Sequence, residues 1–218
     1  MAEQRVVLFN NYYDFLKAKQ GDSSTDPLTF ERLAKFYIDY IKQLQADGPY
    51  TLVGWSFGGL LAFEITKQLS SLGDKVNHLI LLDSYFNYQE AWNQSLFTDV
   101  SMFENNVNYQ YQPERFHAPY PLEITLFKAK QVDEQPITDG IGAKSFDPEY
   151  ALKYKSIHAY YVNEVEDNHI NQYVSQANVH VVPMEASHNS WINNHQVIQQ
   201  IVSKITMTSQ STGQQSDE

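Results

Sequence analysis

Cysteine is absent from this sequence of 218 residues. The chain therefore has no disulfide framework, no thiolate ligand for zinc and no cysteine nucleophile, and we expect no metal site. Long apolar runs are missing too, since no stretch approaches the length that spans a bilayer and the N-terminus lacks a basic segment followed by an apolar one. These absences predict a soluble, cytoplasmic protein with no membrane contact.

Positive charge is scarce. The chain has 15 Lys and Arg residues against 26 Asp and Glu residues, which gives a formal net charge of -11. Such a surface repels the phosphates of nucleic acids, so we expect no nucleic-acid partner. The acidic excess is typical of a soluble chain and does not by itself indicate a basic partner. The length is typical of one domain with a sizeable core.

Short apolar runs alternate with helical patterns along the chain. The predicted strands are 6–9, 50–53, 76–82, 123–127 and 179–182. The segments with helical spacing of apolar residues are 33–44, 60–69, 150–165 and 191–205. This alternation predicts an α/β fold with a mostly parallel, doubly wound sheet, formed by residues 1–206 as a single domain. Residues 207–218 are expected to form a polar, disordered tail.

One serine stands between a predicted strand and a predicted helix, in the run Gly54-Trp55-Ser56-Phe57-Gly58. This context indicates a nucleophile elbow, in which a strained turn pushes the serine hydroxyl above the sheet. Glycines on both sides of the serine are expected to let the turn and the helix approach closely. The alternative is an ordinary strand-to-helix turn that carries no chemistry.

A serine hydroxyl is a weak nucleophile, so Ser56 needs a histidine base and a carboxylate, in the chain order serine, acid, histidine. Asp83 ends the strand 76–82, at the carboxyl edge where parallel sheets present reactive side chains, and its alternative role is to cap a helix or loop. His188 is the candidate base because it follows the strand 179–182 and precedes a helix. His195 is the alternative base.

The residues from Leu44 to Ile65, with the elbow among them, resemble the type I thioesterase domain that ends nonribosomal peptide synthetases and some polyketide synthases. The run Leu81-Leu82-Asp83-Ser84 resembles the context of the family's acid, 27 positions after Ser56. At the histidine, Ala186 stands where the family often has glycine. The resemblance covers residues 28–84 strongly and 123–205 loosely, and it implies an α/β-hydrolase-type fold.

The resemblance also implies a chemistry. Such domains take an acyl or peptidyl chain from the phosphopantetheine thioester of a carrier protein onto the serine, and release it by hydrolysis or cyclisation. By this likeness Ser56 forms the acyl-enzyme, His188 moves the protons, Asp83 holds its tautomer, and the backbone amide of Phe57 contributes to the oxyanion hole. The phosphopantetheine belongs to the carrier protein, so the chain itself is expected to bind no cofactor.

Two further expectations concern regions outside these residues. The aromatic-rich interval of about 86–120 corresponds to the family's helical lid, with ordinary core packing as the alternative. The family's first strand and the loop that supplies a second oxyanion amide are not recognisable, so we expect an N-terminally shortened domain of weakened activity. A missing strand would leave a sheet edge uncovered, which predicts a homodimer.

Two other functions fit the same residues. A stand-alone hydrolase would use the same serine on simple esters and would need no carrier protein. A catalytically impaired fragment, without a complete oxyanion hole, would act only in association with another protein.

Overall fold

The computed structural model describes residues 29–87, 90, 111–133 and 148–211. Within these residues four strands form one sheet in the order β1-β2-β3-β4, and each neighbouring pair is parallel. The strands are β1 (Tyr50–Trp55), β2 (Val76–Leu82), β3 (Phe116–Gln131) and β4 (Val174–Ser187). Because all four run in one direction, their carboxyl ends share one edge of the sheet, and this edge positions the candidate site.

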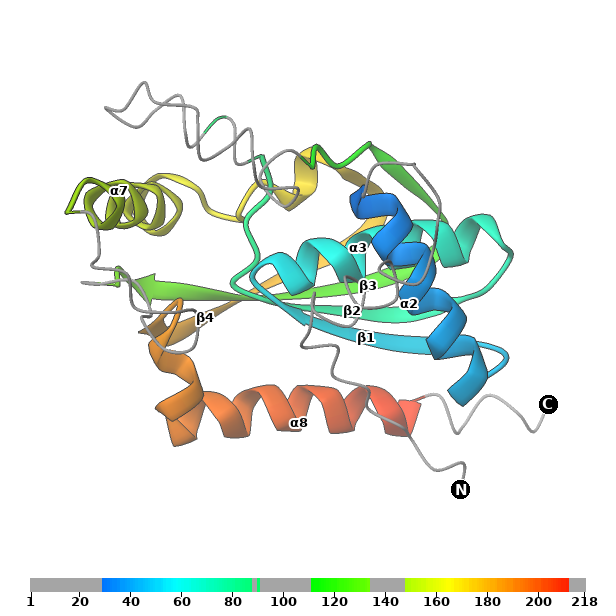
Figure 1. Ribbon diagram of the computed structural model, residues 1–218. Helices are drawn as coiled ribbons and strands as arrows, with labels where there is room; N and C mark the ends of the chain where they lie inside the picture. The colour runs from blue at the N-terminus through cyan, green and yellow to red at the C-terminus, as the bar shows by residue number, and fades with distance from the viewer. Residues whose placement is uncertain (1–28, 88–89, 91–110, 134–147, 212–218) are drawn as a thin grey trace.

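Helices cover both faces of the sheet (Figure 1). The helices α2 (Phe30–Leu44) and α3 (Phe57–Ser71) lie on one face, and α8 (His195–Ser211) lies on the other. The remaining helical segments are α7 (Pro148–Glu164), which contacts β3, and the short 3-10 helices η1 (Ile170–Gln172) and η2 (Ser190–Asn193). The predicted α/β class, with a parallel sheet wound on both sides, is confirmed.

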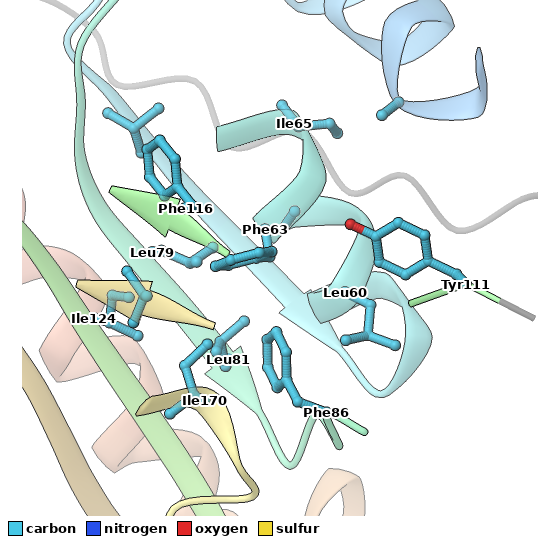
Figure 2. Packing of buried hydrophobic residues seen from close by; sticks show 14 of the residues in the cluster. Leu60, Phe63, Ile65, Leu79, Leu81, Phe86, Tyr111, Phe116, Ile124 and Ile170 are labelled. Atoms are coloured by element: carbon cyan, nitrogen blue, oxygen red, sulfur yellow. The ribbon is translucent and has the colours of Figure 1, made fainter. Parts of the chain in front are cut away.

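The sheet separates two apolar cores. Figure 2 shows the larger core, where Leu60 and Phe63 of α3 pack over Leu79 and Leu81 of β2. The smaller core on the opposite face joins the sheet to α8, and its members include Ile80, Leu82, Phe127, Val197 and Ile201. Alternate residues of β2 therefore enter different cores, which explains why its second half, Leu79 to Leu82, is a continuous apolar run in the sequence.

Two strands are longer than their apolar segments suggested. The strand β3 begins at Phe116, before the predicted 123–127 and inside the interval predicted for the lid. Prolines at 119 and 121 argue against a strand, and here they coincide with a shift in the β3–β4 register between His117 and Leu122. The strand β4 mixes apolar with polar residues outside 179–182, so only its centre, where His180 is the one polar residue, has a mostly apolar pattern.

Some expectations lie partly or wholly outside the described residues. These are the strand 6–9, residues 88–89 and 91–110 of the lid interval, and residues 212–218 of the tail. The N-terminal shortening and the homodimer therefore stay predictions. The helix α8 continues to Ser211, past the expected domain end at 206. In the part of the chain that the structure describes, no helix combines the length and the apolar character needed to cross a membrane.

The glycines of the elbow have different surroundings. A Cβ at Gly54 would lie 2.5 Å from the Cα of Gly59 and would overlap the carbonyl oxygen of Gly58, so the strand and helix can meet here only through glycine. A Cβ at Gly59 would lie 2.6 Å from the Cβ of Ser84. A Cβ at Gly58 would meet no atom of the described residues within 4 Å beyond its own helix. Among the described residues, close packing therefore fixes Gly54 and Gly59 as glycines, while no contact requires glycine at position 58.

This difference predicts opposite outcomes for two identical substitutions in one motif. Gly54→Ala should lower the free energy of unfolding by about 1–3 kcal/mol or more, because the new methyl group meets backbone atoms that cannot rotate away. Gly58→Ala should change it by less than about 1 kcal/mol and in the stabilising direction, since alanine favours helix. Urea unfolding of the two variants measures both effects, and equal destabilisation by the two would contradict this reading.

Candidate active site

Ser56 occupies a strained turn between β1 and α3. Its backbone dihedrals are φ 54° and ψ -125°, a conformation that side chains rarely adopt. The turn is held by the Ser56 N–H, which donates to the carbonyl oxygen of Leu82 at 3.0 Å. The Ser56 side chain does not cap α3, and it is partly exposed. The predicted elbow therefore places this hydroxyl at the carboxyl edge of the sheet, available for another contact.

That contact is with His188, and a continuous chain of hydrogen bonds links three strand ends. Ser56 Oγ lies 2.9 Å from Nε2 of His188, and Nδ1 of His188 lies 2.8 Å from Oδ2 of Asp83. An ionised carboxylate can only accept, so Nδ1 of His188 carries the proton and donates it to Asp83. Nε2 is then the acceptor for the Ser56 hydroxyl. The structure thus brings together the three side chains singled out in the sequence.

Asp83 is buried and accepts hydrogen bonds from four segments of the chain. Its Oδ2 accepts from His188 and from the Tyr85 hydroxyl, the latter at 2.7 Å. Its Oδ1 accepts from the backbone N–H of Ala129 at 2.9 Å and from the side-chain amide of Asn168 at 3.3 Å. With only 1 % of its surface exposed, the carboxylate depends on these donors in place of water.

The donors also control the protonation of Asp83. Burial alone would raise its pKa, but the hydrogen bond and the charge interaction with His188, together with the bonds from Ala129 and Tyr85, hold the pKa below its ordinary value of 3.8. Asp83 is therefore ionised at neutral pH. In that state it fixes the proton on Nδ1 of His188 and favours the positive charge that the ring acquires when Nε2 takes up a proton.

Aromatic rings enclose the imidazole of His188. The ring centroids of Trp55, Tyr85 and His158 lie 5.7, 5.0 and 4.7 Å from that of His188. The indole N–H of Trp55 also donates to the backbone carbonyl of His188 at 3.1 Å. These contacts restrict the orientation of the ring, so Nε2 stays directed at the serine. Only 5 % of His188 is exposed.

The other histidine considered as a base does not reach this site. His195 is exposed at the start of α8, and its Nε2 lies 2.9 Å from the side-chain amide of Gln199 on the same helix. Trp191, expected within that helix, lies in η2 instead. The short 3-10 turn separates His188 from α8, which explains why two histidines close in sequence have different surroundings.

Four residues near the triad were not anticipated from the sequence: Tyr85, His158 and Asn168, and Asp133, whose Oδ2 lies 3.4 Å from Nδ1 of His158. Asp133 carried the same signal as Asp83, since it follows the end of a parallel strand, but the predicted strand stopped at 127 and the structural one continues to Gln131. The other three had no distinguishing pattern, because a loop asparagine, a helical histidine and a tyrosine near a strand end are all common.

Phe57 is the first residue of α3. The N–H groups of a first helical turn point outward along the axis, and the helix dipole places partial positive charge there. An anion beside Ser56 would therefore face the amide of Phe57. Among the described residues, no group of three or more His, Asp or Glu side chains could hold a metal ion.

Comparisons with known proteins point to one family. The family model described as thioesterase domain matches residues 10–205. N-(5-amino-5-carboxypentanoyl)-L-cysteinyl-D-valine synthase of Amycolatopsis lactamdurans is 28% identical over 211 residues, which are 94% of this chain and 5% of that protein. Bacitracin synthase 3 of Bacillus licheniformis is 50% identical over 50 residues, 23% of this chain and 1% of the relative. The chain thus spans about 5% or less of these relatives.

One solved structure with which the chain can be superposed is also a thioesterase. RedJ-Thioesterase from the prodiginine biosynthetic pathway in Streptomyces coelicolor is 16% identical, with a TM-score of 0.48. The alignment covers 81% of this chain and 67% of the RedJ chain.

The lowered pKa of Asp83 predicts a pH-dependent stability. Because the ionised form is stabilised only in the folded state, its contribution is fully present above the ordinary pKa of 3.8 and is lost as the pH falls through the lowered folded value. Asp83→Asn should cost about 1–3 kcal/mol at neutral pH, since the carboxylate's donors lose their charged acceptor. Below about pH 4 the two proteins should converge in stability. Urea unfolding across the pH range measures this, and curves that stay parallel down to about pH 2 would contradict it.

Proposed function

The chain belongs to the thioesterase domain family, and we propose that it releases an acyl or peptidyl chain from the phosphopantetheine thioester of a carrier protein through an acyl-enzyme on Ser56. The observation that carries the proposal is the hydrogen-bonded chain from Ser56 Oγ through His188 to Asp83, with distances of 2.9 and 2.8 Å. This arrangement suits nucleophilic acyl transfer, since a base is within reach of the hydroxyl and a carboxylate orients the base.

In the first half of the reaction, Ser56 Oγ attacks the carbonyl carbon of the thioester while its proton passes to Nε2 of His188. The carbon–sulfur bond then breaks, and the pantetheine sulfur leaves as a thiol with the proton from His188. The acyl chain remains as an ester on Ser56. Asp83 keeps Nδ1 protonated and stabilises the imidazolium during the transfer.

In the second half, water attacks the ester carbonyl and gives a proton to His188, which returns it to Ser56 Oγ as the free acid leaves. An amine or hydroxyl of the acyl chain itself could replace water and would give a cyclic product. In both halves the carbonyl oxygen develops negative charge. We assign the backbone N–H of Phe57, at the N-terminus of α3, as one donor to that oxygen.

The relatives support the choice of substrate class. As their names say, the relatives from Amycolatopsis lactamdurans and Bacillus licheniformis are a synthase of a cysteinyl-valine compound and bacitracin synthase 3. Domains in such multienzymes receive their substrates from carrier domains, so we propose a carrier protein as the partner and a cytoplasmic location. The phosphopantetheine would come with the carrier. A homodimer, predicted from the N-terminal sequence, remains part of this proposal.

Covalent labelling tests the assignment of Ser56. A fluorophosphonate should modify this serine alone, because its neighbour His188 removes the hydroxyl proton, and peptide mass spectrometry locates the adduct. His188→Ala should slow labelling on the order of 10³-fold. The matched control is His195→Ala, an exposed histidine on α8 that should label at the normal rate. Labelling at another residue, or the reverse order of the two histidine variants, would exclude this triad.

Substrate preference separates the carrier-dependent thioesterase from a small-ester hydrolase and from an impaired fragment. An acyl-pantetheine thioester and the p-nitrophenyl ester of the same acyl group are compared by kcat/KM, each with the Ser56→Ala variant as blank. We expect the thioester to be preferred, and preferred further when carried on a carrier protein. Preference for the simple ester would support the stand-alone hydrolase, and no turnover above the blank would support the impaired fragment.

A further inference from the structure

A second carboxylate–histidine pair lies beside the first, and the reaction described above does not use it. Asp133 and His158 are 7 % and 4 % exposed, and Nδ1 of His158 lies 3.4 Å from Oδ2 of Asp133. The ring centroid of His158 lies 4.7 Å from that of His188, with the ring planes at 88°. In the second pair (Asp133 and His158), His158 therefore packs edge-on against the ring of the catalytic histidine.

The sheet order explains this proximity. Ser56 follows β1, Asp83 follows β2 and His188 follows β4. Asp133 follows β3, which lies between β2 and β4. Because the carboxyl ends of parallel strands share one edge, the end of β3 lies between the acid and the base. Each of the four strands is thus followed closely by one polar side chain of this cluster.

Asp133 is also tied to the loop that carries His188. The side-chain amide of Asn189, the next residue in the chain, donates to Oδ2 of Asp133 at 3.0 Å and to the hydroxyl of Tyr154 at 2.7 Å. Tyr154 in turn packs on His158, with ring centroids 4.0 Å apart. The carboxylate therefore restrains both the backbone next to His188 and a ring that touches it.

The second pair carries one negative charge. Burial would raise the pKa of Asp133, but hydrogen bonds from His158 and Ser187 hold it below its ordinary 3.8. Burial lowers the pKa of His158 below 6.5 more than its bond to Asp133 raises it. At neutral pH the carboxylate is therefore ionised and His158 is neutral. The charge of Asp133 is not cancelled within the pair, and it acts on the groups around it.

We propose that Asp133 is a second positioning carboxylate of the active site, which holds the loop of His188 and stabilises the protonated form of its ring. The inference rests on the proposed function, since it assigns His188 as the base. Asp83 acts on the ring directly, through Nδ1. Asp133 acts through Asn189, through His158 and through its charge, so the imidazolium forms between two carboxylates.

Other groups also face the ring of His188. They are Asp83 and Tyr85 after β2, Ser56 and Trp55 at the elbow, and His158 and Tyr154 on α7. Lys128 on β3 interacts with Asp83 and adds a positive charge nearby. Loss of Asp133 would make His158 still harder to protonate, so His158 stays neutral in the variant. A shift of the acidic limb in the pH profile of kcat/KM of an Asp133 variant therefore reports the loss of the Asp133 charge.

The test is the pH profile of kcat/KM for Asp133→Asn with an acyl-pantetheine thioester. The side-chain amide oxygen introduced at position 133 can still accept the hydrogen bond from Asn189. The loop that carries His188 therefore stays held in place while the charge is lost. Without the charge, protonation of His188 becomes harder and the base stays active at lower pH. At an effective dielectric constant of about 20 or more, the acidic limb should move down by roughly 0.5–1 pH unit. The plateau should fall about threefold to tenfold, because the imidazolium is less stabilised in the transition state.

Glu123→Gln is the matched control. This exposed carboxylate on β3 also pairs with a histidine, His180, at 3.1 Å, and its loss changes the net charge equally. It lies near the middle of β3, away from the carboxyl end of the strand, so the acidic limb should stay in place. Asp133→Ser keeps a small hydrogen-bond acceptor and should show the same shift of the acidic limb. It replaces Asp133→Asn as the test if that variant does not fold. Circular dichroism verifies that each variant is folded.

The outcomes separate two failures. An acidic limb that stays in place in folded Asp133→Asn and Asp133→Ser, whatever the plateau, would overturn the electrostatic role and leave a purely structural residue. His188→Ala in the protein that keeps Asp133 tests the proposed function itself. If this variant still acylates Ser56 at the full rate, the proposed function fails, and the acidic limb of the kcat/KM profile has another cause. A shift in both Asp133 variants and in Glu123→Gln would show a general charge effect and would also overturn the inference.

Discussion

Asp83 accepts hydrogen bonds from the segments that follow or belong to three neighbouring strands, and the geometry of the site depends on it. The bond from Ala129 ties it to β3, the bond from His188 ties it to the segment after β4, and Tyr85 lies two residues further along its own segment. Removing any donor would leave a nearly inaccessible charge short of partners, which is costly in free energy. The carboxylate thus fixes the strand ends and the imidazole together.

The imidazole lies between two carboxylates of different kinds. Asp83 bonds directly to Nδ1, and Asp133 is linked to the ring's neighbours, Asn189 and His158. The chain supplies both from equivalent places, since each follows one of two adjacent parallel strands. A base that gains and loses a proton in every acyl transfer benefits from an environment that favours the charged ring without trapping it. Two partners, one bonded and one acting through space, supply such an environment.

Much of the fold and the core of the site could be predicted from the sequence. Buried parallel strands are continuous apolar runs, so β1 and β2 were predictable, and the serine between strand and helix marked the elbow. The strand-end rule located Asp83 and His188. It missed Asp133, because the polar residues Lys128, Lys130 and Gln131 concealed the carboxyl end of β3. The glycine pattern did not identify the second closely packed position, since position 58 faces open space among the described residues while Gly59 packs on Ser84. Such contacts depend on tertiary packing and have no local signal.

The direct bond between Asp83 and Nδ1 of His188 is the central claim, and proton NMR of the imidazole tests it. A ring proton held by a buried carboxylate should give a strongly downfield resonance that disappears in His188→Ala. We expect that Asp83→Asn also removes or displaces this signal, whereas Ser56→Ala and Asp133→Asn keep it. A resonance unchanged in Asp83→Asn would show that another acceptor holds the proton, and it would contradict the account.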